Sequence, residues 1–155
     1  DQSMHVTGMR LRRKEDGWLG FERSYRFDYS EDGQDRHIGR VVLLGDKLVA
    51  VQNQYSPIHM ETQDTMDYCA KLGLAFVCWS PLGGYRHPYD EHLFDPFREV
   101  AAKHGVSYQR VVLAWELAKG DHMFVIPGAH RPETILDSLK ADELELSPDE
   151  LAYLG

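Results

Sequence analysis

Short apolar runs that alternate with helical patterns constrain the fold of this chain most strongly. Residues 74–79, "LAFVCW", are apolar without alternation, so both faces of this strand should be covered. The segments "LVAVQ" (48–52) and "MFVIP" (123–127) are also predicted to be strands. Helical patterns lie between and after them, which predicts parallel βαβ units rather than hairpins. Because such crossovers are right-handed, the carboxyl ends of the strands should meet at one edge.

The predicted helices are marked by apolar spacing and by capping residues. A helix over residues 61–73 should end at Gly73. Its apolar face consists of Met66, Cys69 and Ala70, extended by Leu72. A further helix is predicted in the latter part of 92–105, where Phe97, Val100 and Ala101 are spaced for one face. Another is predicted over 107–120, with Ser107 as N-cap and one apolar side formed by Val111, Ala114, Trp115 and Ala118. Two more should begin after Arg131, with Pro132 in the first turn, and after Ser147, where Glu150 completes a capping box.

Composition narrows the class of protein. The 155 residues suffice for one domain with a sizeable core, and 43% apolar with 27% charged residues is ordinary for a globular protein. A formal net charge of −8 argues against nucleic-acid binding, and the basic run "RLRRK" (10–14) is most simply a solvated segment. No apolar run is long enough for a membrane span, and the start lacks the features of a signal peptide. We therefore expect a cytoplasmic protein with Cys69 and Cys78 free and buried.

The chain divides into two regions of different character. Residues 1–40 are rich in charge, glycine and aromatic side chains and show little sustained periodicity, so we expect a short irregular leader. Residues 41–155 contain the strand and helix patterns. The predicted fold is therefore α/β, with parallel strands in the second region.

The loops at the predicted edge offer amide, aromatic and glycine groups. Gln52 and Gln54 are two residues apart, so they share one side of the strand and could bind a carboxamide or a sugar, or satisfy the loop backbone. Trp79 ends its strand, where it could stack on a flat ring or belong to the core. Gly83 and Gly84 allow close approach of a ligand to the backbone, or a positive φ in a turn.

The segment "IPGAHRPETI" (126–135) predicts an anion site. It places backbone N–H groups and the start of a helix directly after a strand, an arrangement that suits a phosphate. His130 and Arg131 would add positive charge there, whereas Glu133 would oppose a phosphate.

Other chemistries find less support in the sequence. His87, Asp90 and His92 lie close together, but no HExxH or CxxC spacing is present, so a solvated loop is the better interpretation and no metal is expected. Ser80 has no G-x-S-x-G frame around it and is not expected to be a nucleophile. The GxGxxG and GxxxxGK[ST] motifs are absent.

Residues 41–155 resemble the C-terminal half of aldo-keto reductases. The resemblance is carried by "VAVQNQYSP", "DYCAKLGLAFVCWSPLGG", "GVSYQRVVLAWELA" and "VIPGAHRPETILDSLKADELELSPDELA", which follow the order and spacing of that family. It implies half of a TIM-type (β/α)8 barrel and a nicotinamide-dependent oxidoreductase that reduces carbonyls or oxidises alcohols, usually with NADPH.

The same resemblance implies which positions contact the cofactor. Gln52 matches the amide that contacts the nicotinamide carboxamide, and Trp79 matches the aromatic residue that stacks on the nicotinamide ring. The loop along the pyrophosphate is matched by Ser80, Leu82 and Gly84. Gly128 and Ala129 match the adenosine-phosphate segment, and Asp137 and Ser138 match positions near the adenine. Thr134 stands where many NADPH-preferring members carry an arginine, so the choice between NADP and NAD stays open.

The catalytic residues are not assigned. In this family the catalytic Asp, Tyr, Lys and His come from the N-terminal half of the barrel, and about 40 residues cannot hold four or five βα units. The leader weakly resembles sugar and pyridoxal dehydrogenases of the family, with Thr7 at the position expected for the lysine and an apparent jump near residues 32–40. Tyr25, Tyr29 and Tyr55 are available as proton donors, but nothing in the sequence places them.

A half-barrel would expose two long sheet edges, which favours self-association or a leader that covers the open side. Three functions follow as alternatives. The first is an aldo-keto reductase-type oxidoreductase, complete or truncated, that acts on a small sugar- or pyridoxal-like carbonyl compound. The second is a non-catalytic module for nucleotide binding or assembly. The third is a remnant without a ligand.

Overall fold

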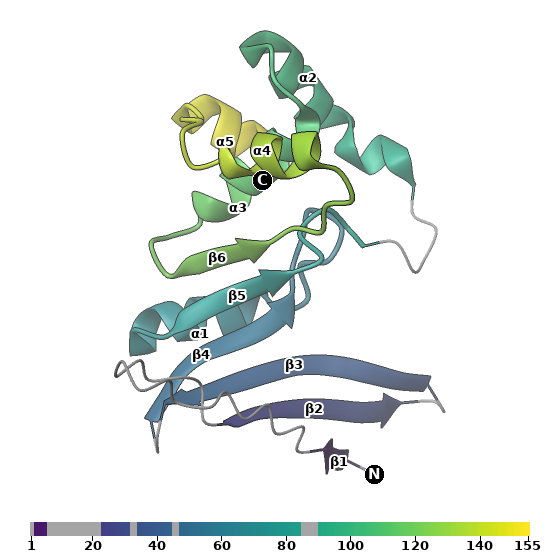
Figure 1. Ribbon diagram of the computed structural model, residues 1–155, viewed down its shortest axis with the longest axis vertical. Coiled ribbons are helices and arrows are strands. Elements are labelled where there is room, and N and C mark those ends of the chain that lie inside the picture. Colours follow the sequence, from purple (N-terminus) through teal and green to yellow (C-terminus); the bar gives the residue numbers. More distant parts are fainter. Residues whose placement is uncertain (1, 6–22, 32–33, 45–46, 85–89) are drawn as a thin grey trace.

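The computed structural model describes residues 2–5, 23–31, 34–44, 47–84 and 90–155, with side chains from Leu48 onward. In this part of the chain the strands form one sheet in the order β1-β2-β3-β4-β5-β6 (Figure 1). The strands are β1 (Gln2–His5), β2 (Arg23–Glu31), β3 (Gln34–Leu44), β4 (Lys47–Gln54), β5 (Ala75–Trp79) and β6 (Met123–Ile126). The helices are α1 (Gln63–Leu72), the 3-10 helix η1 (Glu91–Phe94), α2 (Asp95–His104), α3 (Tyr108–Leu117), α4 (Pro132–Leu139) and α5 (Pro148–Leu154).

The parallel βαβ units predicted for the second region are confirmed. β4 pairs in parallel with β5 and β5 with β6, so that Gln54, Trp79 and Ile126 lie level across the three strands. The arrowheads of these strands point the same way in Figure 1. Their carboxyl ends therefore share one edge, as the crossover rule requires.

The leader differs from the irregular segment that the sequence suggested. β1, β2 and β3 are consecutive antiparallel strands, and β3 pairs antiparallel with β4, with Arg40 opposite Gln52. Only two residues separate β2 from β3 and β3 from β4, which is typical of hairpins. β3 thus occupies the edge of β4 that a half-barrel would leave open.

The core lies on one face of the parallel strands. Phe76 and Cys78 of β5 are fully buried against Met66 and Cys69 of α1 and Trp115 of α3. Both cysteines are free, as expected. This face therefore holds the hydrophobic core, covered by α1 and α3.

Helix ends and helix faces largely follow the sequence. Gly73 and Gly105 end α1 and α2 in the left-handed conformation, with φ of 65° and 66°. The predicted capping box of Ser147 and Glu150 is present at α5. The predicted faces need two corrections: Ala70 and Leu72 of α1 and Ala118 after α3 are exposed. α1 buries a narrower stripe than predicted, whereas every residue of α3 from Val111 to Glu116 is buried because α3 is covered on several sides.

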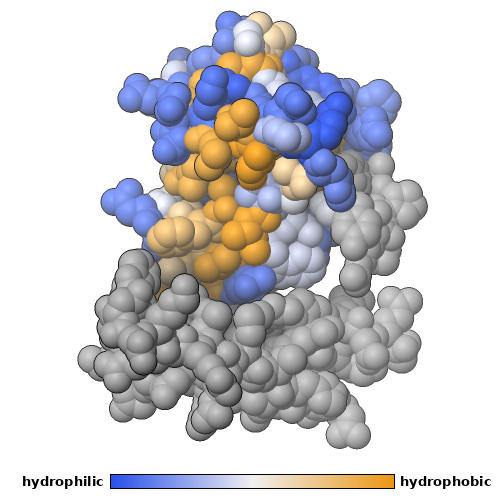
Figure 2. Space-filling view, viewed as in Figure 1, coloured by the Kyte–Doolittle hydropathy of each residue, from blue (hydrophilic) through white to orange (hydrophobic). Residues whose placement is uncertain are grey.

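The other face of the parallel strands is open. Side chains alternate along a strand, so Val77, Phe124 and Ile126 point away from the core. Phe124 and Ile126 are 55% and 47% exposed. In Figure 2, which has the same view as Figure 1, orange apolar surface lies in the middle of this side of the molecule.

No helix in the described part of the chain is long and apolar enough to cross a membrane.

Candidate functional site

The candidate site lies at the carboxyl-end edge of β4, β5 and β6. Because Trp79 is level with Ile126, the loop that starts at Ser80 lies beside the segment that starts at Pro127. The backbone N–H of Tyr55 donates to the carbonyl of Trp79 at 3.4 Å, which connects the exit of β4 to this edge. Three loops from distant parts of the sequence are thus brought together.

Gln52 and Trp79 lie on the open face of the sheet. Gln52 is level with Val77, and Trp79 is two residues further along β5, so parity places both on the same side. Both are partly buried. Asn53 lies between them in register and is buried on the core side. The amide and the indole can therefore address one ligand from the face that carries Phe124.

The loop after β5 has unusual backbone dihedral angles. Ser80 has a φ of 52°, and Gly83 and Gly84 have φ of 88° and 79°. The N–H of Gly83 donates to the carbonyl of Ser80 at 2.9 Å, which closes a turn. A Cβ on Gly84 would lie 3.2 Å from the Ser80 hydroxyl. The two glycines are required by this backbone, and a non-glycine residue at positive φ is common at ligand-binding sites.

Leu82 has a different role from the other loop residues. Its side chain is partly buried and packs against the hydrophobic core. Any contact of Leu82 with a pyrophosphate would therefore come from its backbone, and its side chain fixes the loop to the sheet.

The segment after β6 borders an open hollow of about 490 Å³. The hollow is lined by Pro127, Ala129, His130, Arg131, Pro132 and Ile135. Gly128 is exposed beside it. Arg131 is the N-cap of α4 and receives no side-chain cap, while the Thr134 hydroxyl donates to its carbonyl at 2.7 Å. Pro132 has no N–H group, and the N–H of Thr134 donates to the carbonyl of Arg131 at 3.2 Å. The attraction for an anion would therefore come mainly from the two basic side chains beside the start of the helix.

Asp137 and Ser138, which the resemblance placed near an adenine, already have partners. The Asp137 carboxylate accepts hydrogen bonds from the Ser107 hydroxyl and the Arg110 guanidinium. The Ser138 hydroxyl donates to the carbonyl of Thr134 at 2.9 Å. Asp137 therefore connects α4 to the start of α3, so its first role is structural.

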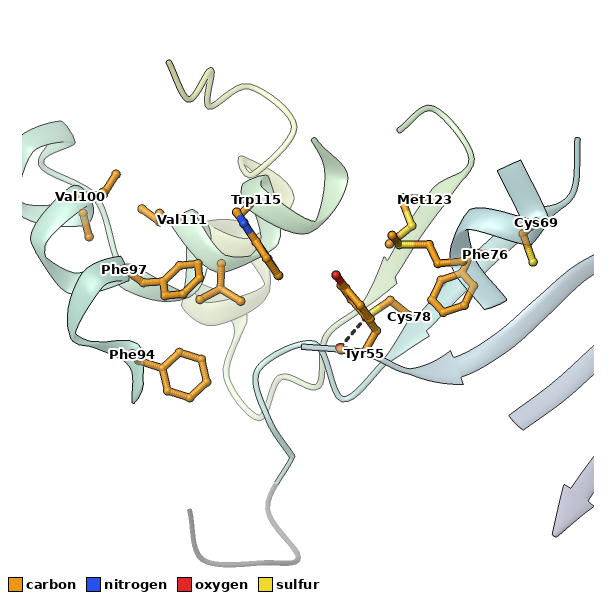
Figure 3. Close-up of a cluster of buried hydrophobic side chains, with 13 residues drawn as sticks. Tyr55, Cys69, Phe76, Cys78, Phe94, Phe97, Val100, Val111, Trp115 and Met123 are labelled. Carbon is orange, nitrogen blue, oxygen red and sulfur yellow. Dashed lines mark hydrogen bonds between the residues drawn. The ribbon is translucent and has the colours of Figure 1, made fainter. Parts of the chain in front are cut away.

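Tyr55, one of the candidate proton donors, does not reach the open face. Tyr55 is fully buried on the core side, where its ring stacks on Trp115 at 6.0 Å between centroids (Figure 3). Its hydroxyl donates to the side-chain oxygen of Gln63 at 2.5 Å. Burial, with a smaller effect of Glu116, raises the pKa of Tyr55 to about 12. Tyr25 and Tyr29 lie in β2, separated from β4 by β3. Thr7 lies outside the described residues.

Glu116 is a buried carboxyl group that the sequence patterns did not reveal. It is fully buried in α3, and neither carboxyl oxygen accepts a hydrogen bond from a described nitrogen or oxygen donor. Burial raises its pKa well above the usual value, and the nearby Cys78 thiol offsets this in part. The thiol itself donates to the carbonyl of Tyr55 at 2.9 Å, drawn as a dashed line in Figure 3, and burial raises its pKa.

Two of the residues considered as metal ligands, Asp90 and His92, hydrogen-bond with neighbouring residues in the chain. Asp90 caps the N–H of His92, and the His92 ring bonds Asp95 at 2.9 Å. His87 lies outside the described residues. Within the described ranges no three His, Cys, Asp or Glu side chains are grouped to hold a metal ion.

Two family models match the chain. The model described as "Aldo/keto reductase family" matches residues 41–155. The model described as "Protein of unknown function (DUF3301)" matches residues 1–55. The two matches overlap over residues 41–55, which contain the end of β3 and all of β4.

Known proteins resemble the parallel region over part of their length. Pyridoxine 4-dehydrogenase of Escherichia coli (strain K12) is 32% identical over 108 residues, which cover 70% of this chain and 36% of that enzyme. The crystal structure of the thermostable aldo-keto reductase Tm1743 with the inhibitor epalrestat has a TM-score of 0.63 at 32% identity, covering 70% of this chain and 39% of that one. The aldose reductase of Giardia lamblia has a TM-score of 0.58 at 26% identity, covering 66% of this chain and 34% of that one. The chain thus spans less than half the length of these proteins.

Proposed function

This chain belongs to the aldo-keto reductase family, and we propose that the edge formed by β4, β5 and β6 binds a nicotinamide nucleotide. Members of this family typically use NAD(P)H, which supplies a hydride when bound. The observation that carries the proposal is the register of Gln54, Trp79 and Ile126, which gathers three loops at one edge. The chain would then provide the cofactor half of a site for a small sugar- or pyridoxal-like carbonyl compound.

The geometry of the edge is suited to such a nucleotide in three places. Gln52 offers an amide for the carboxamide, and Trp79, on the same face, offers a ring for stacking. The loop with the partly buried Gly84 offers a backbone without a Cβ, which a pyrophosphate could approach closely. The hollow beside Ala129 offers the positive charge of His130 and Arg131 to the adenosine phosphate.

Cofactor preference is part of the proposal. Thr134 is partly buried and its hydroxyl is held by the carbonyl of Arg131. Arg131 and His130 line the hollow and remain available to a phosphate. Titration with both NADPH and NADH therefore decides between NADP and NAD.

A titration followed by tryptophan fluorescence tests the binding proposal. NADPH or NADH should quench the emission of the full chain, and Trp79→Ala should weaken binding at least about fivefold because stacking contributes roughly 1 kcal/mol or more. Trp115→Phe is the matched control, because Trp115 is buried in the core and should leave the affinity unchanged. An unchanged affinity in Trp79→Ala would contradict the assignment.

A non-catalytic nucleotide-binding module is the second candidate. It is favoured by Tyr55, whose hydroxyl is directed into the core and whose pKa is raised to about 12. Turnover separates the two candidates. Oxidation of reduced cofactor on addition of pyridoxal or a simple aldehyde supports the enzyme, whereas binding without oxidation supports the module.

A further inference from the structure

Helix α4 carries an apolar stripe that nothing in the described chain covers. Pro132, Ile135, Leu136 and Leu139 have the i, i+3, i+4, i+7 spacing of one helix face. Ile135, Leu136 and Leu139 are 39%, 59% and 64% exposed, and no residue of α4 is buried. A stripe of this kind normally packs against another element, so its exposure marks a contact surface.

The stripe is continuous with other apolar surface. Ile135 also lines the hollow together with Pro127, which follows β6. In β6, Phe124 and Ile126 are about half exposed, at 55% and 47%. Figure 2 shows orange surface extending from the strands toward the helices on this side of the molecule. The exposed patch is therefore larger than a single scattered side chain.

The charges beside the stripe favour a second copy of the same chain as its partner. Glu133 and Lys140 are exposed, lie seven residues apart, and so flank the stripe on the same side at its two ends. Neither forms an ion pair with another described residue. If two α4 helices pack antiparallel, Glu133 of each copy lies opposite Lys140 of the other. A parallel arrangement would instead place like charges side by side, which is unfavourable.

We propose that α4 forms the interface of a symmetric homodimer, in which the stripes of two copies pack antiparallel and are flanked by two Glu133–Lys140 ion pairs. Such a two-fold interface is self-complementary and closes on itself, so it protects the stripe without forming a fibre. The proposal does not depend on nucleotide binding.

Sedimentation velocity of the full chain over a range of concentrations tests this interface. We expect a concentration-dependent dimer. The double variant Leu136→Glu/Leu139→Glu should raise the dimer dissociation constant at least about a hundredfold, because it places charge in the centre of an apolar contact. Leu72→Glu is the matched control: Leu72 is 53% exposed on α1, and its substitution should leave the dimer intact. Circular dichroism of each variant checks the fold.

A charge exchange tests the orientation of the helices. Glu133→Lys alone should weaken the dimer about tenfold, because both symmetric ion pairs become repulsive. Adding Lys140→Glu should restore the affinity. The proposal is overturned by a monomer at all concentrations, by a dimer that is insensitive to the Leu136 and Leu139 substitutions, or by a dimer that only Phe124→Lys dissociates.

Discussion

The antiparallel and parallel regions of the sheet differ in how their strands are connected, and β4 belongs to both. On one side β4 pairs with β3 in a chain of hairpins, and on the other it pairs with β5 through the crossover helix α1. The two family matches overlap on the same strand. A strand has two independent hydrogen-bonding edges, so a parallel unit and an antiparallel one can share it without conflict.

The comparison also shows which edges and faces of the sheet are covered and which are exposed. The antiparallel strands occupy the outer edge of β4, and the helices cover the core face of β5 and β6. The face with Phe124 and Ile126 corresponds to the interior of a closed barrel, where side chains from all strands would pack in layers. The chain spans 36% of its E. coli relative, and in the described residues Phe124 and Ile126 of this face are exposed.

Breaking β4 should have the largest effect, because both regions depend on it. Ala50 lies in the middle of β4, opposite Val42 on one side and Ala75 on the other. We expect Ala50→Pro to abolish folding, since proline removes a ladder hydrogen bond and is not tolerated in a central strand. Circular dichroism measures the loss, with Leu48→Ala in the same strand as the control that should still fold. A native Ala50→Pro variant would contradict the shared-strand description.

Removing the central aromatic of the core should have the next largest effect. Trp115 packs on Tyr55 and Phe97, and its indole N–H donates to the carbonyl of Gly155 at 3.0 Å. We expect Trp115→Ala to lower the free energy of unfolding by about 3–5 kcal/mol, measured in urea. The exposed Tyr153→Ala is the control, with a change below about 1 kcal/mol.

The same unfolding experiment in urea also tests whether the antiparallel and parallel regions unfold together. If the regions unfold together, Trp115→Ala moves a single transition to lower urea concentration. Two separate transitions, of which only one moves, would show that pairing across β4 does not couple them.

Replacing Glu116 should stabilise the protein at neutral and higher pH. Its pKa is raised by burial above the usual 4.5, so the folded state keeps a proton that the unfolded state loses. The protonation of Glu116 therefore does not reduce the free energy of unfolding below pH 4.5, whereas its ionisation lowers that free energy as the pH rises from there toward the folded-state pKa. We expect Glu116→Met to gain about 1–3 kcal/mol near neutral pH and to remove this dependence. Urea denaturation at several pH values checks it, and an unchanged pH profile would count against the buried carboxyl group.

Loss of the α5 cap should have the smallest effect. The hydroxyl of Ser147 accepts the N–H of Glu150, and its backbone N–H donates to the Glu150 carboxylate at 2.9 Å. The backbone N–H and the hydroxyl of Ser147 bond the Glu150 carboxylate, as does the His104 ring, and together they lower the pKa of Glu150 to about 2. Their contribution is therefore lost as the pH falls toward that value. Ser147→Ala should lower the free energy of unfolding by about 1 kcal/mol in thermal or urea melts, and Ser147→Asp should restore most of it.

The parallel region could be predicted because its signals are local. Continuous apolar runs marked β5 and β6, glycines marked the ends of α1 and α2, and strand parity put Gln52 and Gln54 on one side of their strand. That Trp79 shares this side is known only from the register of β4 and β5. The faces of α1 and α3 were less certain, because a helix pattern does not reveal how many neighbours surround it. For the same reason the burial of Glu116 depends on packing that no sequence window contains.

The antiparallel region was missed although it carries a signal. Tyr25, Phe27 and Tyr29 alternate with polar residues, and the dipeptide sequence Asp-Gly at 32–33 is one that hairpins favour. The register shift between Phe27 and Asp28, together with many charged residues, obscures this alternation. The structural role of Asp137 was hidden for another reason: its partners, Ser107 and Arg110, are distant in sequence and meet it only through the packing of α3 on α4.

The central claim is that one edge gathers Gln52, Trp79 and Gly128 around a single nicotinamide nucleotide. A nuclear magnetic resonance titration of the ¹⁵N-labelled chain with NADPH and NADH tests it most directly. We expect the Trp79 indole, the Gln52 side-chain amide and the backbone N–H of Gly128 to shift together with one dissociation constant. Shifts confined to one of these positions, or no shifts at all, would contradict it.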